Sequence, residues 1–149
     1  MNTTLLRIAM NCWPPLLGAG IRVRHISTDF RAVRVTLKMG LLNRNYVGSH
    51  FGGSLFAMTD PFYMLMLMHN LGQGYIVWDQ AARISFIKPG RGAVSCEFRL
   101  DQALLETIRS ATAGGQKHLQ DFSVEIRDAQ GEVVASVVKT LYIRQKPAK

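Results

Sequence analysis

Residues 52–68 read GGSLFAMTDPFYMLMLM, and this apolar stretch decides the fold. We predict one helix over 53–71, bent at Pro61 and ended by Gly72. Leu55 to Met58 supports a continuous helix, because it holds helix-forming side chains and no turn signal. A helix that is hydrophobic nearly all round must be buried. We therefore expect a single soluble domain built around it.

Asp60 is the only charged side chain between Arg44 and His69. We expect it to be a buried acid with a raised pKa or a specific partner, as suits a general base. The competing hypothesis is structural. Asp followed by Pro is also typical of an N-cap and the first helical position, so that Asp60 would only cap a helix beginning at Pro61.

Alternating apolar and polar residues around this helix predict an α+β fold, in which an antiparallel sheet of five or six strands wraps the helix. The strands are predicted over 18–27, 32–39, 75–87, 93–100, 118–127 and 133–143, with helical turns over 2–10 and 101–110. We expect the residues 11–15 to end the first helical turns, because they include two prolines.

The composition is that of one globular domain spanning residues 1–149, with 48% hydrophobic and 19% charged residues. We expect residues 1–17 to pack on the domain and residues 145–149 to form a flexible tail. Cys12 and Cys96 have neither disulfide nor metal spacing, which indicates a reducing compartment. The N-terminus lacks a signal peptide and the apolar run over 61–68 is too short for a bilayer, so we expect a cytoplasmic protein.

The net charge of +8 favours anionic partners. The basic residues are spread along strand-like segments and form no block, so we expect no nucleic acid, no membrane, no metal and no separate cofactor. A structural or nucleic-acid-binding protein remains a third hypothesis on the charge alone.

Residues 45–60, NYVGSHFGGSLFAMTD, resemble the signature of the PaaI-like hotdog thioesterases, which has an Asn, a His-Gly-Gly and an Asp on the central helix. The strand from Trp78 to Phe86 and the turn after it are similar to that family as well. The resemblance covers residues 20–143 and is greatest to an uncharacterised branch, a domain of unknown function. In this chain Phe51 stands directly before the two glycines and His50 one residue earlier.

The resemblance implies a hotdog fold and a role for each matching residue. Asn45 would orient the substrate or water, the Gly53 N–H would polarise the thioester carbonyl, and Asp60 would act as nucleophile or general base. Asp79 would lie where relatives hold the attacking water, and His50 is a further catalytic candidate. The expected substrate-binding residues are Gly52, Phe51, Ser54, Lys88 and Arg91, with the coenzyme A phosphates near the turn at residues 88–91.

The leading hypothesis is therefore an acyl-CoA thioesterase-like hydrolase, in which coenzyme A is part of the substrate. Hotdog proteins generally pair two sheets edge to edge with their sites at the interface, which implies a homodimer or a tetramer. The alternative hypothesis is a non-catalytic protein that binds acyl-CoA or a fatty acyl ligand. The Met-Leu run over 64–68 is then either core or one wall of an acyl pocket.

Overall fold

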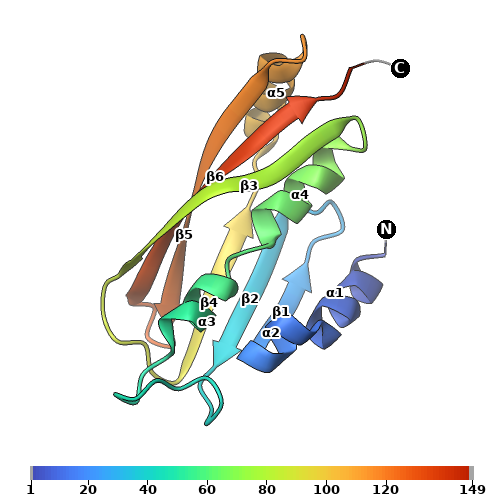
Figure 1. Cartoon of the computed structure of the whole chain (residues 1–149). Helices are drawn as coiled ribbons and strands as arrows, with labels where there is room; N and C mark the ends of the chain where they lie inside the picture. Colours follow the sequence, from blue (N-terminus) through green and yellow to red (C-terminus); the bar gives the residue numbers. More distant parts are fainter. Residues whose placement is uncertain (1, 148–149) are drawn as a thin grey trace.

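The computed structural model describes residues 2–147, so the last two residues of the predicted tail lie outside it. Six antiparallel strands form one sheet in the order β1-β2-β4-β5-β6-β3, which confirms the predicted α+β layout. The elements (Figure 1) are α1 Thr3–Cys12, α2 Pro14–Ala19, β1 Ile21–Ile26, β2 Ala32–Lys38, α3 Gly52–Ala57, α4 Phe62–Leu71, β3 Tyr75–Phe86, β4 Ala93–Arg99, α5 Gln102–Thr112, β5 Lys117–Asp128 and β6 Val133–Gln145.

The core lies between the inner face of the curved sheet and the helices α3 and α4, which cross it (Figure 1). Side chains along a strand point alternately to the two faces, and β6 follows this rule with Val137, Leu141 and Ile143 fully buried. From the helical side, Met58 and Leu67 are equally buried. None of the helices within residues 2–147 is long and apolar enough to span a bilayer.

The predicted central helix is present over Gly52 to Leu71, but it consists of two helices rather than one bent helix. The interruption covers residues 58–61. The N–H groups of Thr59 and Asp60 bond to carbonyls only three residues back, and Pro61 has no N–H to donate. Asp60 therefore lies in the break between α3 and α4.

The N-terminal prolines begin a helix where we expected only an interruption. Pro14 and Pro15 occupy the first positions of α2, where their missing N–H groups cost nothing, and the strand starts at Ile21 instead of Gly18. Asn11 fixes α1 to the outer edge of β1: its side chain accepts the N–H of Val23 at 2.8 Å and donates to the carbonyl of Val23 at 3.1 Å.

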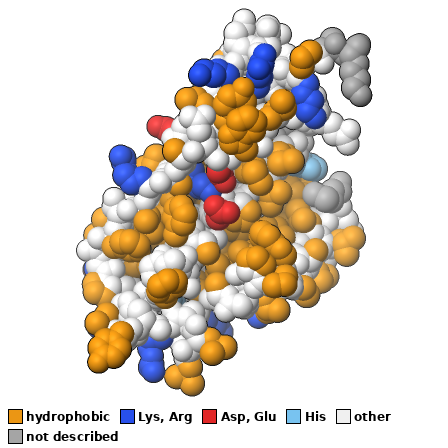
Figure 2. Space-filling model, in the orientation of Figure 1, with side chains coloured by type: hydrophobic (Ala, Val, Ile, Leu, Met, Phe, Trp, Pro, Cys, Tyr) orange, Lys and Arg blue, Asp and Glu red, His pale blue; other side chains and the backbone are white. Residues whose placement is uncertain are grey.

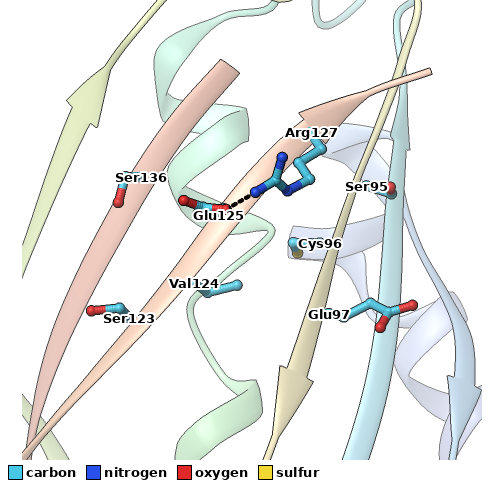
Figure 3. A pocket seen from close by; sticks show the side chains of 8 residues that line it. All are labelled: Ser95, Cys96, Glu97, Ser123, Val124, Glu125, Arg127 and Ser136. Atoms are coloured by element: carbon cyan, nitrogen blue, oxygen red, sulfur yellow. Dashed lines mark hydrogen bonds and ion pairs between the residues drawn. The ribbon is translucent and has the colours of Figure 1, made fainter. Parts of the chain in front are cut away.

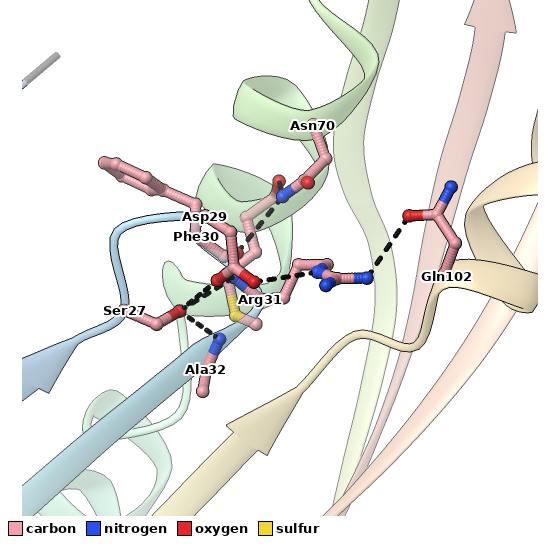
Figure 4. Close-up of polar contacts among 8 residues, drawn as sticks. Ser27, Asp29, Phe30, Arg31, Ala32, Asn70 and Gln102 are labelled. Atoms are coloured by element: carbon pink, nitrogen blue, oxygen red, sulfur yellow. Dashed lines mark hydrogen bonds and ion pairs between the residues drawn. The ribbon is translucent and has the colours of Figure 1, made fainter.

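The turn between β1 and β2 is tied to the central helices (Figure 4). Asp29 accepts hydrogen bonds from the Ser27 hydroxyl at 2.5 Å and from the Arg31 N–H at 3.0 Å, and these bonds lower the pKa of Asp29 to about 2. Phe30 takes a positive φ of 55°, and its carbonyl accepts the side-chain amide of Asn70 on α4 at 3.1 Å.

The sheet opens between β4 and β5 (Figure 3). These strands pair at only two positions, Val94 with Asp128 and Ser95 with Arg127. Beyond them a cavity of about 520 Å³ separates the strands. Tyr63 of α4 bridges the inner side of this gap: its hydroxyl donates to the Ser123 carbonyl of β5 at 3.2 Å, and its ring packs edge-on against Phe98 of β4. Burial raises the pKa of Tyr63 to about 12.

Candidate functional site

Asp60 is exposed in the chain, with 58% of its side chain accessible, so the prediction of a buried acid is wrong. The helix break is the cause, because it turns the carboxylate out of the apolar interface that a continuous helix would have given it. The capping hypothesis also fails. The residue in the N-cap position of α4 is Pro61, and no side-chain hydrogen bond caps that helix.

The side chain of Lys139 fixes the position of Asp60 by hydrogen bonds. It is fully buried in β6, on the core face shared with Val137 and Leu141. Its Nζ donates to the Asp60 carbonyl at 2.5 Å and to the Asp60 Oδ1 at 3.1 Å. It also donates to the Asp79 Oδ2 at 2.8 Å. A buried ammonium is tolerated only when it is paired and hydrogen-bonded, and the two carboxylates meet both conditions.

Lys139 did not feature among the predicted site residues. A signal was available, because Lys139 interrupts the alternating apolar positions of residues 133–143 at a place where a core side chain is due. Asp79, by contrast, was a predicted site residue, and it belongs to the charged cluster formed by Lys139, Asp60 and Asp79. A bulge between Asp79 and Ala81 turns β3 at this point, as bulges next to functional sites often do. The Asp79 Oδ1 is buried without a partner among the described residues.

Asp60 and Gly53 line one cavity of about 260 Å³ between α2 and α3. The Gly53 N–H has no acceptor within residues 2–147, since the first bonds of α3 come from the N–H groups of Ser54 and Leu55. A side chain at position 53 would clash with the ring of Phe51, which lies against the glycine. An exposed carboxylate and a backbone N–H without an acceptor among the described residues therefore border the same space.

Asn45 and His50 lie in a separate cavity of about 390 Å³, which Gly52 and Lys88 also line. His50 is buried, and its Nε2 is 2.7 Å from the Gly92 carbonyl. Its Nδ1 has no partner among the described residues. The Asn45 amide donates to the Ser49 hydroxyl at 2.8 Å, so both side chains shape their own loop. The start of α3 divides the two cavities, with Gly52 on one side and Gly53 on the other.

The remaining predicted residues are dispersed. Lys88 is paired with Asp128 at 2.8 Å and with Glu132, and the hydrogen bond from Lys88 to Asp128 raises the pKa of Lys88. Arg91 is exposed and forms no ion pair within the described chain. Ser54 is buried and borders neither cavity. Within a single chain, therefore, the predicted residues line two separate cavities or lie outside both.

The family model of a domain of unknown function, DUF4442, matches residues 2–143. The chain belongs to the DUF4442 family. A comparison of this DUF4442 protein with curated proteins gave no match.

Solved structures give the fold of the DUF4442 domain. It is similar to a Pseudomonas aeruginosa protein of unknown function described as a probable thioesterase, with 22% identity over 97% of both chains and a TM-score of 0.84. A thioesterase from Haemophilus influenzae is 14% identical over 97% of this chain and 92% of its own, with a TM-score of 0.71. The Escherichia coli PaaI protein of the phenylacetic acid degradation operon is 14% identical over 96% and 91%, with a TM-score of 0.62. The predicted hotdog fold is confirmed.

Proposed function

We propose that this protein hydrolyses acyl-CoA thioesters. The observation that carries the proposal is the pairing of Asp60 with Gly53 on one cavity, with Asp60 held at two atoms by a buried lysine. An exposed but anchored carboxylate can reach a substrate without a large loss of side-chain freedom, and fixed geometry is what general-base or nucleophilic catalysis requires.

In this reaction the thioester carbonyl oxygen accepts the Gly53 N–H, which stabilises the negative charge of the tetrahedral intermediate. Asp60 takes a proton from water while the water oxygen attacks the carbonyl carbon. The C–S bond then breaks, the thiolate of coenzyme A leaves and takes up a proton, and the carboxylic acid is released. Asp60 can instead attack the carbonyl first, in which case water cleaves the resulting anhydride.

The division of the predicted residues between two cavities favours a homodimer as the active form. The side chain of Asn11 covers the outer edge of β1 by its two hydrogen bonds to the backbone of Val23, whereas the outer edge of β3 pairs with no other strand within residues 2–147. Residues 80–82 in the middle of β3 are small or flexible and exposed, which allows a second strand to approach. Edge-to-edge pairing of two β3 strands would let the cavity of Asn45 in one protomer complete the Asp60 cavity of its partner.

Coenzyme A brings phosphate groups, and the exposed Arg91, which follows the cavity-lining residue Gly90 in the chain, is a cation for them without an ion pair among the described residues. Lys88 is a weaker candidate than the sequence indicated, because Asp128 and Glu132 already neutralise it. The +8 net charge of the chain adds long-range attraction for such a substrate.

The test is hydrolysis of acetyl-, hexanoyl-, palmitoyl- and phenylacetyl-CoA by the wild type, Asp60→Asn and Glu106→Gln. Glu106 is an exposed acid on α5, remote from both cavities, and its variant is the matched control. We expect wild-type turnover of at least one thioester, a loss of about a hundredfold or more in Asp60→Asn, and full activity in Glu106→Gln. No turnover by the wild type, or full activity of Asp60→Asn, would refute the proposal.

Single turnover in heavy-oxygen water separates the two roles of Asp60. Direct attack by water places the heavy oxygen in the acid product during the first turnover. Attack by Asp60, followed by attack of water on the aspartyl carbonyl of the anhydride, leaves one of the light oxygens of Asp60 in the acid instead, and the label enters the enzyme.

A non-catalytic acyl-CoA-binding protein is the second candidate. The observation that favours it is the position of His50, whose ring is buried and bound to the Gly92 carbonyl rather than directed at Asp60. Calorimetric titration with palmitoyl-CoA distinguishes the two functions: saturable binding without release of free thiol supports the binding protein.

A further inference from the structure

An apolar groove runs between α1 and α4 and adjoins the Asp60 cavity. It has a volume of about 400 Å³ and contains no charged side chain; its lining residues are Ala9, Met10, Cys12, Trp13, Pro61, Met64 and Leu65. Trp13 and Pro61 line the Asp60 cavity as well, so the two spaces are adjacent and share two wall residues. Figure 2 shows hydrophobic side chains spread over this face beside acidic ones.

The groove follows from two interruptions in the helices. Pro14 starts a new helix, and Trp13 is left at the junction of α1 and α2 with 47% of its surface exposed. On the other wall, the break at residues 58–61 ends α3, and α4 then presents Met64 and Leu65 toward α1. Methionine is flexible and adapts to apolar ligands of different shape. The walls therefore combine a fixed aromatic side chain with adaptable ones.

We infer that this groove binds the hydrocarbon chain of a medium- or long-chain acyl thioester, with the carbonyl carbon at the end where Asp60 and Gly53 lie. The inference rests on the proposed function and adds the class of acyl group. A saturated chain matches walls without charge, and Asp60, the one acid of the adjoining cavity, lies where the chain would end in its reactive group.

A second copy of the chain is the rival occupant of the groove. The position of the groove argues against it, because Figure 1 places α4 between β3 and α1. The groove therefore lies on the far side of α4 from β3, the strand through whose edge the dimer is proposed to form. An acyl chain is also the occupant that can extend from the groove to the adjacent Asp60 cavity, whereas a protein surface would cover that cavity.

Ala9→Trp tests the inference, because Ala9 is exposed on α1 and a larger side chain there fills the groove without entering the core. Thr4→Trp is the matched control, since it places the same side chain on an exposed part of α1 outside the groove. We expect Ala9→Trp to lower kcat/KM for palmitoyl-CoA roughly tenfold or more and to leave acetyl-CoA hydrolysis unchanged. Ala9→Phe serves as a second variant if Ala9→Trp does not fold.

Calorimetric binding of palmitate keeps this inference separate from the catalytic proposal. Palmitate binding that Ala9→Trp weakens and Thr4→Trp preserves supports the groove even if no thioester is hydrolysed. Equal palmitate affinity and equal chain-length preference in Ala9→Trp and Thr4→Trp would overturn it. So would a smaller assembly in sedimentation of Ala9→Trp with unchanged palmitate affinity, because the groove would then be a subunit contact.

Discussion

The ammonium of Lys139 donates to the backbone carbonyl of Asp60 at 2.5 Å and to its carboxylate at 3.1 Å. In a continuous helix that carbonyl would accept the N–H four residues later. Here the break leaves the carbonyl free, and a lysine from β6 takes the place of the helical donor. The interruption of the helix and the buried cation are thus complementary, and both fix the position of one carboxylate.

The charge balance of this cluster predicts a stability cycle. Asp60→Asn combined with Asp79→Asn leaves the buried Lys139 without a counter-charge, so we expect a loss of about 3 kcal/mol in the free energy of unfolding. Adding Lys139→Met removes the uncompensated charge and should recover at least half of that loss. Urea unfolding of the double and triple variants measures both values.

The control for this cycle adds Lys117→Met to the double variant. Lys117 is an exposed lysine on β5, and its removal should recover nothing. Equal stability of the two triple variants would contradict the assignment of Lys139 as the charge that Asp60 and Asp79 compensate.

His50→Ala is expected to reduce stability. The substitution removes a buried ring and its hydrogen bond to the Gly92 carbonyl at 2.7 Å, and a hydrogen bond contributes about 0.5–1.5 kcal/mol to stability. Chemical denaturation checks the loss, with His118→Ala on β5 as the control. Unchanged stability together with lost hydrolysis would instead assign His50 to the chemistry.

The open edge of β3 predicts the assembly. Ala81→Asp places a charge on the outer face at the middle of β3, where two copies of the strand would meet, and like charges opposite each other weaken strand pairing. We expect sedimentation equilibrium to show a dimer for the wild type and a larger share of monomer for Ala81→Asp. Ala129→Asp, in the exposed turn between β5 and β6, should remain dimeric. A monomeric wild type would contradict this prediction and the composite site with it.

Asp29 predicts how stability changes in acid. Hydrogen bonds lower its pKa from 3.8 to about 2 in the folded chain. A carboxyl group with a lowered folded pKa stabilises the native state above its unfolded value, and this contribution is lost as the pH falls through the folded value. We therefore expect the contribution of Asp29 to disappear between pH 3.8 and about 2. Thermal unfolding of Asp29→Asn should show a smaller change over that interval than Glu106→Gln; equal slopes would count against it.

The sequence was sufficient for the sheet and for the location of the helical segment, because strand alternation and helix periodicity are local signals. The sequence did not predict that the side chain of Asp60 is exposed. The break that exposes it involves a hydrogen bond from Lys139, which lies 79 residues away in the chain. Pro14 and Pro15 predicted only the end of the first helical turns, although proline also suits the first turn of a new helix.

The sequence alone also does not predict that the candidate site residues divide between two cavities. Gly52 and Gly53 are neighbours in sequence, yet they border different spaces because successive residues of a helix point in different directions. Asn45 and Asp60 therefore match one family signature while lying apart in the single chain. Only the three-dimensional structure shows that the residues of this signature lie in two cavities rather than in one.

The gap between β4 and β5 is the most weakly hydrogen-bonded strand boundary in the sheet. Two residue pairs join β4 to β5, whereas eleven join β5 to β6. Native-state opening follows the weakest contacts, so we expect the half made of β1, β2 and β4 to open as one unit and the half made of β5, β6 and β3 as another. Lys139, Asp79 and the free strand edge all belong to the second unit. The fold thus places its charged cluster and its expected contact with a partner in one module, which Tyr63 connects to the other.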